Sequence, residues 1–565
     1  MRSTMQEWPL RLSHVLDYGS TVHADTEILT WTGTAARTTT NAEIGRLAAR
    51  LAHGLRELGV RGDDRVATFC WNNDVHLAAY LAVPAMGAVL HPLNIRLPAD
   101  HLAYSANQVA DKVVLVDSTL IPALAPILPK LSTVEHVVVV GDGDVEPLAA
   151  AGKPVHRFEE LVGSQPDTFD WQYDGDETEA AAICYSSGTV GLPKGVAYSH
   201  RSIWLHSMQI AAAGSFGFAP TTRSLVVVPM FHVMAWGMPH AAFMTGAGLL
   251  MPDRFLTPEP LAAMIAAAKP THGAAVPSIW TGLLAYLNAH PTDTSTLKEV
   301  VVGGSACPES LMRGFDEHGI RIVHAWGMTE TSPLGSIARP PAGVTGDELW
   351  RYRLSQGQIP ASVQARIVAP DGSIAPRDGE TVGELEVAGP WITGRYLDSD
   401  EPAPGGVPSR QPGSPAASRD SDRFDDGWLR TGDVGTLSAD GYITLTDRAK
   451  DVIKSGGEWI SSVELENHLM AHPAVLEAAV VGVPDPRWEE RPLASVVLRD
   501  GATATPEELR DFLADRIPRW QLPERWTFLT EVPKTTVGKF DKKVIRRRYA
   551  EGDLAVRNLK ESAPE

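Results

Sequence analysis

Between about residues 30 and 330, short apolar runs rich in β-branched residues alternate with stretches of helical periodicity. Residues 65–70 form such a run before the helical pattern at 76–89, residues 112–116 follow, and residues 299–302 and 321–323 repeat the motif later. An alternation of this kind predicts crossover units, in which parallel strands are covered by helices. We therefore expect an α/β fold whose large N-terminal domain contains parallel sheets.

Residues 360–445 differ, because strand-like runs at 365–368, 383–387 and 441–445 are closely spaced and separated by turns. This spacing predicts an antiparallel, barrel-like subdomain. Inside it, residues 400–424 are rich in Pro, Gly, Ser and Asp, which predicts a mobile surface insertion.

A compact α+β pattern begins after Asp447. Within it, Thr505, Pro506 and Glu508 form a helix start, with Thr505 as N-cap, proline at the first helical position and Glu508 placed for a capping box. The expected organisation is an N-terminal domain over 1–446 and a small, mobile α+β C-terminal domain over 447–565. We expect the active site in the cleft between them.

Composition narrows the class of protein. At 565 residues the chain is too long for one core, and 44% hydrophobic with 21% charged residues is usual for a soluble protein. No apolar run reaches the roughly 20 residues of a membrane span, and the first residues lack a signal peptide's apolar stretch, so we expect a cytoplasmic protein. A net charge of −19 disfavours nucleic acid as a partner, yet a local cluster of lysines can still bind an anionic substrate. The three cysteines, Cys70, Cys184 and Cys307, are interpreted as small core residues.

The most informative segment is the loop over residues 185–196, Tyr-Ser-Ser-Gly-Thr-Val-Gly-Leu-Pro-Lys-Gly-Val. Its glycines allow backbone N–H groups to approach an anion, its hydroxyls add donors or a metal ligand, and its lysine adds a positive charge. The phosphate-binding residues expected here are Ser186, Ser187, Gly188, Thr189, Gly191 and Lys194. The loop is not a Walker A loop, because glycine rather than Ser or Thr follows the lysine. The alternative, a flexible surface loop, is disfavoured by the strand-like apolar run at 180–185 that precedes it.

This loop resembles the phosphate-binding signature of the adenylate-forming enzymes, the superfamily of acyl-CoA synthetases, firefly luciferases and non-ribosomal peptide adenylation domains. Val190 stands where the family usually has Ser or Thr. Further segments match the superfamily in the same order, so that the resemblance covers nearly the whole chain. It implies ATP, CoA and a carboxylic acid as substrates, and Mg²⁺ as cofactor.

Residues 228–236 resemble the gate segment of the fatty acyl-CoA synthetases, in which a tryptophan closes the acyl tunnel. The resemblance makes Trp236 the gate, with His232 and Val233 beside it. A glycine-rich stretch follows the strand-like run at 299–302, and by resemblance the adenine ring and the acyl carbonyl pack there, on Gly303, Gly304, Ser305 and Ala306. The alternative is that the apolar residues of the gate segment are core and His232 is a buried, hydrogen-bonded histidine.

Residues 326–330, Trp-Gly-Met-Thr-Glu, resemble the family's Tyr-Gly-x-Thr-Glu motif. In that motif the aromatic ring stacks on adenine, the threonine contacts the α-phosphate and the glutamate binds magnesium. The roles are carried here by Trp326, Thr329 and Glu330, with Ser186 and Thr189 expected to complete the magnesium shell. Trp326 replaces the usual tyrosine and lacks its phenolic hydroxyl.

The remaining motifs concern the ribose, the hinge and the second half of the reaction. By resemblance Asp433 binds the ribose hydroxyls, Arg448 braces the sugar or phosphate, and Lys450 is the hinge. The following loop would line the approach of the thiol after domain rotation, with Lys454 as a catalytic residue and Ser455, Gly456, Gly457, Glu458 and Trp459 along the tunnel. Lys539 matches the C-terminal lysine that reaches the carboxylate and α-phosphate. Its neighbours Lys542, Lys543 and 546–548 are interpreted as a solvated basic face.

The resemblance within the superfamily is to bacterial medium- and long-chain fatty acyl-CoA synthetases. It implies ATP-dependent formation of an acyl-AMP and pyrophosphate, followed by transfer of the acyl group to CoA. A ligase for a short, sulfur-containing or aryl acid is the alternative on the same scaffold, and a nucleotide-binding regulator without catalysis is a more distant one. Some related synthetases form homodimers through the N-terminal domain, so we expect a homodimer here.

Overall fold

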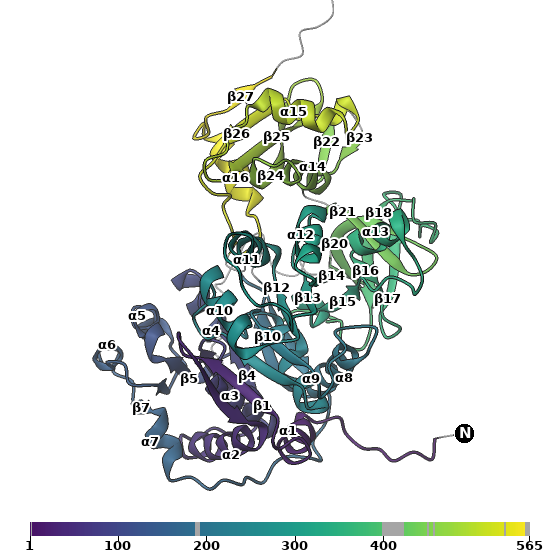
Figure 1. Ribbon diagram of the computed structural model, residues 1–565. Helices are drawn as coiled ribbons and strands as arrows, with labels where there is room; N and C mark the ends of the chain where they lie inside the picture. The colour runs from purple at the N-terminus through teal and green to yellow at the C-terminus, as the bar shows by residue number, and fades with distance from the viewer. Residues whose placement is uncertain are drawn as a thin grey trace, which may run out of the picture.

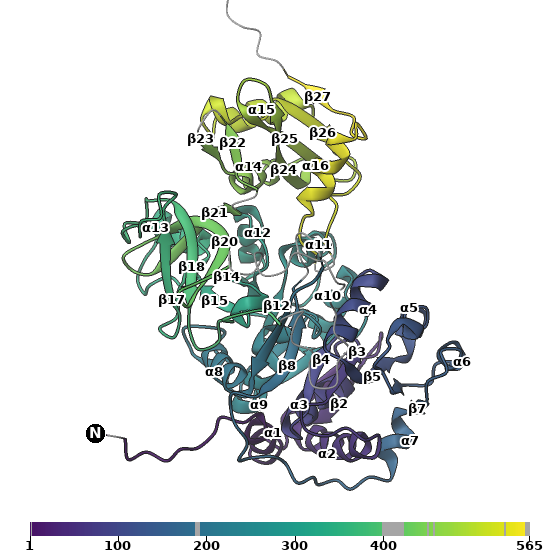
Figure 2. The same cartoon turned by 180° about the vertical axis from the view of Figure 1, so that it is seen from behind.

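The computed structural model describes residues 1, 3–186, 192–397, 423–448, 451–455, 458–535 and 538–559. In these residues the chain forms three sheets, with the C-terminal domain (yellow-green) above the rest of the molecule (Figures 1 and 2). The fold is α/β, as the sequence predicts. The predicted insertion at 400–424 lies almost entirely outside the described residues.

The first sheet has the order β7-β6-β5-β3-β4-β8-β9, and its described neighbours pair in parallel except for β8 and β9. Its strands are β3 (Arg65–Phe69), β4 (Val89–Pro92), β5 (Asp111–Asp117), β6 (His136–Val140), β7 (Val155–Arg157), β8 (Ala180–Tyr185) and β9 (Gly195–Ser199). The antiparallel β8–β9 hairpin carries the predicted phosphate loop at its tip.

The second sheet has a parallel half and an antiparallel half that meet at β14. The parallel half contains β1 (Glu27–Trp31), β10 (Arg223–Val226), β11 (Gly248–Met251), β12 (His272–Ala275), β13 (Glu299–Val302) and β14 (Arg321–Gly327), with β2 (Ala36–Thr40) antiparallel at the edge. The antiparallel half contains β15 (Leu334–Ile337), β16 (Gly357–Gln358), β17 (Gln364–Val368), β18 (Gly383–Ala388), β19 (Phe424–Asp425), β20 (Trp428–Leu437) and β21 (Tyr442–Arg448). This half includes the antiparallel strands predicted over 360–445, but it begins earlier than predicted, with β15 and β16, and β21 extends to Arg448.

Helices separate and cover the two sheets. The most buried is α3 (Asp74–Ala85), which is apolar on nearly all sides and joins α9 (Met238–Thr245) and both sheets in one hydrophobic core. Helix α3 ends at Ala85, earlier than the predicted 76–89, because Gly87 takes a positive φ of 83° and Val89 starts β4. The other helices of this part are α1 (Leu12–Thr21), α2 (Asn41–Glu57), α4 (Ala99–Gln108), α5 (Ile121–Leu124), α6 (Glu146–Ala149), α7 (Phe158–Gly163), α8 (His200–Ala211), α10 (Pro258–Ala268), α11 (Pro277–Ala289), α12 (Glu309–Glu317) and α13 (Gly346–Leu354).

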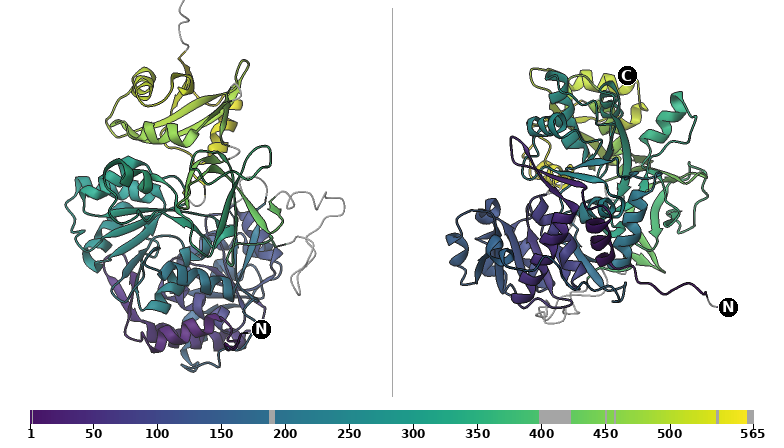
Figure 3. Two further views of the ribbon diagram at one scale, coloured as in Figure 1. Left: turned by 90° about the vertical axis from the view of Figure 1, so that its right-hand side faces the viewer. Right: turned by 60° about the horizontal axis from the view of Figure 1, so that its bottom comes forward.

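The third sheet lies in the C-terminal domain. It contains β22 (Ile453–Ser455), β23 (Glu458–Ile460), β24 (Val475–Asp485), β25 (Glu489–Leu498), β26 (Arg525–Phe528) and β27 (Arg557–Asn558), packed with α14 (Ser462–Met470), α15 (Pro506–Ala514) and α16 (Lys542–Ala550). The predicted capping box at Thr505 and Glu508 is present at the start of α15. From the side, the domain sits over one end of the N-terminal part (Figure 3). None of the helices in the described ranges is both long and apolar enough to cross a membrane.

Candidate active site

The candidate site begins at the carboxyl ends of two adjacent parallel strands, where Gly303 follows β13 and Trp326 closes β14. Gly304 has a φ of +90°, and a Cβ atom there would lie 3.2 Å from Cε of Lys539. A Cβ atom at Gly303 would lie 3.2 Å from the Trp236 ring. A Cβ atom would therefore be crowded at both positions, at Gly304 by a lysine of the C-terminal domain, and the positive φ of Gly304 also favours glycine there.

Lys539 reaches this place on a tight loop that precedes α16. The Lys539 N–H donates to Oγ1 of Thr535 at 3.2 Å, and the Thr535 N–H donates to the Lys539 carbonyl at 2.7 Å. Ser278, in the first turn of α11, donates to the Gly538 carbonyl at 3.3 Å. Figures 1 and 2 show this yellow segment descending from the C-terminal domain to α11. The two domains therefore meet at the predicted catalytic lysine.

His232 lies close enough to Lys539 to respond to its charge. Burial, and then the nearby cations Lys539 and Arg96, lower the pKa of His232 to about 3. The imidazole is therefore neutral at physiological pH.

The predicted gate residues form an unusual left-handed turn over 233–237, which we call the gate turn. Its φ angles are 38° at Val233, 48° at Met234, 48° at Ala235, 54° at Trp236 and 77° at Gly237. The left-handed conformation costs about 1–2 kcal/mol at each non-glycine residue, so the turn stores strain that burial of its side chains must offset. All five residues are buried.

The structure brings together Trp326, Asp433 and Arg448, the residues predicted to bind the nucleoside. The indole N–H of Trp326 donates to Oδ2 of Asp433 at 2.8 Å, and Nε of Arg448 lies 2.8 Å from Oδ1 of Asp433. Both partners hold the carboxylate in one orientation, and Asp433 and Arg448 face each other in register across β20 and β21. The ring of Trp326 lies against Gly335, where a Cβ atom would be 2.2 Å from Cζ3. Trp326, which stands where the family usually has tyrosine, thus makes a polar contact through its indole N–H.

Glu330 is 5% exposed and lies in a short 3-10 turn, Thr329–Thr331. Its Oε1 accepts a hydrogen bond of 2.5 Å from the hydroxyl of Tyr396, and the hydroxyl of Tyr198 donates to the Thr329 carbonyl at 2.7 Å. Nζ of Lys194 lies 4.5 Å from the centre of the Tyr396 ring. Ser186 closes the base of the phosphate loop, since its N–H donates to the Lys194 carbonyl at 2.8 Å.

Several predicted site residues lie elsewhere or cannot be placed. Lys454 has an exposed side chain on the β22–β23 hairpin of the C-terminal sheet, and Ser455 is buried there against Arg491 at 3.0 Å. Ser305 is exposed and Ala306 is half-buried after β13. Outside the described residues lie Ser187, Gly188, Thr189, Gly191, Lys450, Gly456 and Gly457, together with the side chains of Glu458 and Trp459.

One interpretation of the C-terminal basic stretch is wrong. Lys542 is not solvated, because its ammonium lies 2.8 Å from Oε1 of Glu466 and donates to Oγ of Ser462 at 2.5 Å, with the side chain 11% exposed. Arg546 pairs with Asp451 at 2.7 Å, whereas Lys543 is exposed. The error arises because α14 covers the start of α16, which no local pattern reveals.

The sequence gives no signal for several residues of the site. Tyr396, Tyr198 and Gly335 each contact a predicted site residue, and Ser278 contacts Gly538, the neighbour of Lys539. Their partners are between 9 and 260 residues away along the chain, so only the fold brings them together.

The oxygen atoms that Glu330 and Ser186 offer are suitable ligands for a hard cation. Mg²⁺ prefers carboxylate and hydroxyl oxygens and is usually held by one or two carboxylates together with substrate phosphates. Glu330 and Ser186 offer such oxygens. In the described residues there is no group of three or more His, Cys, Asp or Glu side chains that could hold a metal alone.

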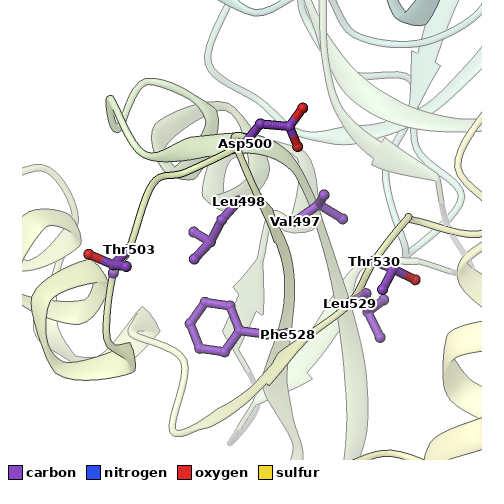
Figure 4. Close-up of a pocket in the computed structure, with 8 residues that line it drawn as sticks. Val497, Leu498, Asp500, Thr503, Phe528, Leu529 and Thr530 are labelled. Carbon is purple, nitrogen blue, oxygen red and sulfur yellow. The ribbon is translucent and has the colours of Figure 1, made fainter.

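A separate hollow of about 600 Å³ lies on the C-terminal domain (Figure 4). Apolar side chains from the ends of β25 and β26 line it, among them Val497, Leu498 and Phe528. None of the predicted site residues borders it.

The comparisons with known proteins agree with this geometry. The family model "AMP-binding enzyme" matches residues 17–397, and "AMP-binding enzyme C-terminal domain" matches 464–539. The chain is 40% identical over 555 residues to a 3-methylmercaptopropionyl-CoA ligase of Ruegeria pomeroyi, covering 97% of this chain and 99% of the relative. It is also 40% identical to a medium-chain-fatty-acid–CoA ligase of Ectopseudomonas oleovorans (91% of each chain) and to a long-chain-fatty-acid–CoA ligase of Thermus thermophilus (97% of each). The structure of the anthranilate CoA ligase AuaEII with anthranoyl-AMP superposes with a TM-score of 0.84 at 23% identity, covering 98% of this chain and 100% of that one.

Proposed function

Because the chain belongs to the family of AMP-binding enzymes, we propose that it is an AMP-forming ligase that joins a medium- or long-chain fatty acid to CoA. The observation that carries this proposal is the position of Lys539 against Gly304, at the carboxyl end of β13. It brings a cation of the C-terminal domain to the strand ends where α/β sheets bind their ligands.

The proposed reaction has two steps. In the first, a carboxylate oxygen of the acid attacks the α-phosphorus of ATP, the bond from that phosphorus to the bridging oxygen breaks, and pyrophosphate leaves. In the second, the thiolate of CoA attacks the acyl carbon of the acyl-AMP, and AMP leaves with the electron pair of the broken C–O bond. Positive charge placed around the phosphoryl oxygens is the main source of rate enhancement in phosphoryl transfer.

Each residue of the site has a role in the first step. Lys539 and Lys194 neutralise charge on the carboxylate and phosphates, Thr329 contacts the α-phosphate, and Asp433 with Arg448 binds the ribose beside Trp326. Magnesium, when bound, shields the phosphate charge, and we propose that Glu330, Ser186 and Thr189 hold it. No protein nucleophile is required, and burial raises the pKa of Cys184 to about 12, which keeps this thiol protonated.

The second step requires a change of domain arrangement. We propose that residues 447–565 rotate about Lys450, so that Lys539 leaves and the 454–459 loop lines the approach of the thiol. The side chain of Lys454 is exposed in this structure. Such exposure is expected of a residue that contacts the substrates only after the rotation. Conformational steps of this kind often accompany two-step catalysis.

The acid is proposed to bind beyond Gly303, with Trp236 and its gate turn controlling entry. Contact between the Trp236 ring and Gly303 supports this role. The relatives named for medium- and long-chain acids favour a fatty acid. A short sulfur-containing acid is the second candidate, because a relative of equal identity is named for 3-methylmercaptopropionyl-CoA.

The test is a screen of pyrophosphate release with ATP and Mg²⁺ over acids from acetate to oleate, including 3-methylmercaptopropionate, with and without CoA. The proposal expects the largest kcat/KM for an acid of medium or long chain, and AMP and acyl-CoA in equal amounts when CoA is present. A maximum at 3-methylmercaptopropionate would favour the second candidate. No pyrophosphate with any acid would refute the ligase assignment.

We also propose a cytoplasmic location and a homodimer formed through the N-terminal domain. The buried, unbridged cysteines fit a reducing compartment. Light scattering of the full chain would decide the oligomeric state.

A further inference from the structure

One side chain contacts two charged residues of the proposed phosphate site, Glu330 and Lys194. Tyr396 is 5% exposed, its hydroxyl donates to Oε1 of Glu330 at 2.5 Å, and its ring centre lies 4.5 Å from Nζ of Lys194. Glu330 follows β14 in the second sheet, whereas Lys194 precedes β9 in the first. Tyr396 therefore connects two segments that belong to different sheets.

The backbone around Tyr396 is tied to the same two segments. The N–H of Thr393 donates to the Glu330 carbonyl at 2.8 Å, and the N–H of Leu397 donates to the Gly195 carbonyl at 2.9 Å. The Tyr396 ring also meets Phe424 edge to face, with 5.4 Å between centroids. These contacts fix where the phenol lies, so its reach to both charged groups is set by the fold.

We propose that Tyr396 is a positioning residue for the adenylation step, an inference that rests on the proposed function. Its hydroxyl holds one oxygen of the Glu330 carboxylate and so directs the other toward the metal–nucleotide complex. Its ring holds the Lys194 ammonium by a cation–π interaction, which keeps the lysine near the phosphate loop before ATP binds. A hydrogen bond from a hydroxyl to a carboxylate is charge-assisted and therefore strong, so it can hold the carboxylate in one orientation.

A purely structural role is the competing explanation, because any buried carboxylate needs a hydrogen-bond donor. The two explanations differ in what the hydroxyl affects. A positioning role concerns the metal dependence of the first half-reaction, whereas a structural role lowers the stability of the fold and so reduces both half-reactions together.

The decisive variant is Tyr396→Phe, which removes the hydroxyl and keeps the ring. Losing a hydrogen bond to a charged group corresponds to a decrease of about 10- to 100-fold in kcat/KM for ATP in acyl-AMP formation. We expect the Mg²⁺ concentration for half-maximal adenylation to rise, while transfer from supplied acyl-AMP to CoA stays within about 2-fold of wild type and the variant remains folded at the assay temperature.

A matched control is Tyr352→Phe. Tyr352 is 8% exposed and donates at 2.8 Å to Oδ2 of Asp440, an exposed carboxylate, so it is also a buried phenol bonded to a carboxylate, and it lies outside the site. The Tyr352→Phe variant should leave both half-reactions and their Mg²⁺ dependence at wild-type values. Tyr396→Leu removes the ring as well, and should reduce adenylation further than Tyr396→Phe because the cation–π contact with Lys194 is also lost.

Two results would overturn the inference: wild-type adenylation and Mg²⁺ dependence in Tyr396→Phe, or equal losses in both half-reactions with a lowered melting temperature. The wild-type chain shows whether the Tyr396 inference or the proposed function has failed. If the proposed function is wrong, the wild type releases no pyrophosphate with any acid; if only the Tyr396 inference is wrong, the wild type still releases it.

Discussion

The buried Lys542–Glu466 pair gives a prediction of stability that can be worked out from the structure. Lys542 Nζ lies 2.8 Å from Glu466 Oε1 and 2.5 Å from Ser462 Oγ, and the side chains of the pair are 11% and 8% exposed. The Ser462 hydroxyl donates in turn to Asp447, and the Val480 N–H donates to Glu466 at 2.7 Å. Replacing Lys542 by Met keeps the length of the side chain but leaves a buried carboxylate without its cation.

Removing one partner of a buried ion pair costs about 3–5 kcal/mol of unfolding free energy. We expect Lys542→Met to lose this amount, and the double variant Lys542→Met, Glu466→Gln to recover part of it, since no unpaired charge is then left in the pair. The neighbouring Lys543→Met is the control, because Lys543 is exposed, and should change the free energy of unfolding by less than about 0.5 kcal/mol.

The pH dependence has a defined sign. Burial raises the pKa of Glu466 to about 7 despite the opposing effect of Lys542, and this is above the ordinary value of 4.5. A folded-state pKa above the unfolded value means that the contribution of Glu466 to the free energy of unfolding falls as pH rises from about 4.5 to 7. Without Lys542 the folded-state pKa rises further, so the deficit of Lys542→Met should be larger at pH 8 than at pH 6.

Hydrogen exchange of the amides of α14 and α16 measures this local stability in the full chain, with denaturant unfolding as a second readout. The expected result is much faster exchange in Lys542→Met than in Lys543→Met. If the two variants exchange alike at pH 8, the pair does not stabilise the C-terminal domain and the reasoning is refuted.

Three further predictions concern the site and the core. Glu330→Gln should lower Mg²⁺-dependent pyrophosphate release by about 10²–10³-fold without loss of fold, because the amide keeps the shape and can still accept the Tyr396 hydrogen bond; wild-type release would contradict the metal role. Trp236→Ala should shift kcat/KM toward bulkier acids in the acid screen while the KM for ATP stays constant; an unchanged acid profile with a raised KM for ATP would make Trp236 a nucleotide contact. Both ring nitrogens of His240 lack a hydrogen-bond partner among the described residues, and burial lowers its pKa to about 4. Because this pKa is below the unfolded value, the contribution of His240 to stability falls as pH drops from about 6.5 toward 4, and His240→Leu should remove this contribution, which amounts to up to about 3 kcal/mol. Melting curves at pH 8 and pH 5 measure it, and equal pH dependence in both proteins would contradict the prediction.

Much of the fold could be predicted because its signals are local. The apolar run at 180–185 and the pattern at 299–302 are the strands β8 and β13, and the Thr505 capping box starts α15 as expected. Strand periodicity and capping depend on neighbouring residues, which the sequence displays directly.

The remaining features depend on contacts between distant segments. The left-handed gate turn has no local signal apart from Gly237, since residues 233–236 would ordinarily avoid positive φ. The hydrogen bond from Tyr396 to Glu330 and the burial of Lys542 require the assembled sheets and the docked α14. The motif order predicted which residues carry charge, and the structure supplies the partners that orient them.

Lys539→Ala, assayed in the two half-reactions separately, tests the central claim most directly. Losing one preorganised charge at a developing anion should slow acyl-AMP formation by about 10²–10³-fold. Transfer from supplied acyl-AMP to CoA should stay within a few-fold of wild type, because in the proposed mechanism the C-terminal domain has by then carried Lys539 away from Gly304. Lys543→Ala should change neither step. Comparable defects in both half-reactions, or none in either, would contradict the account.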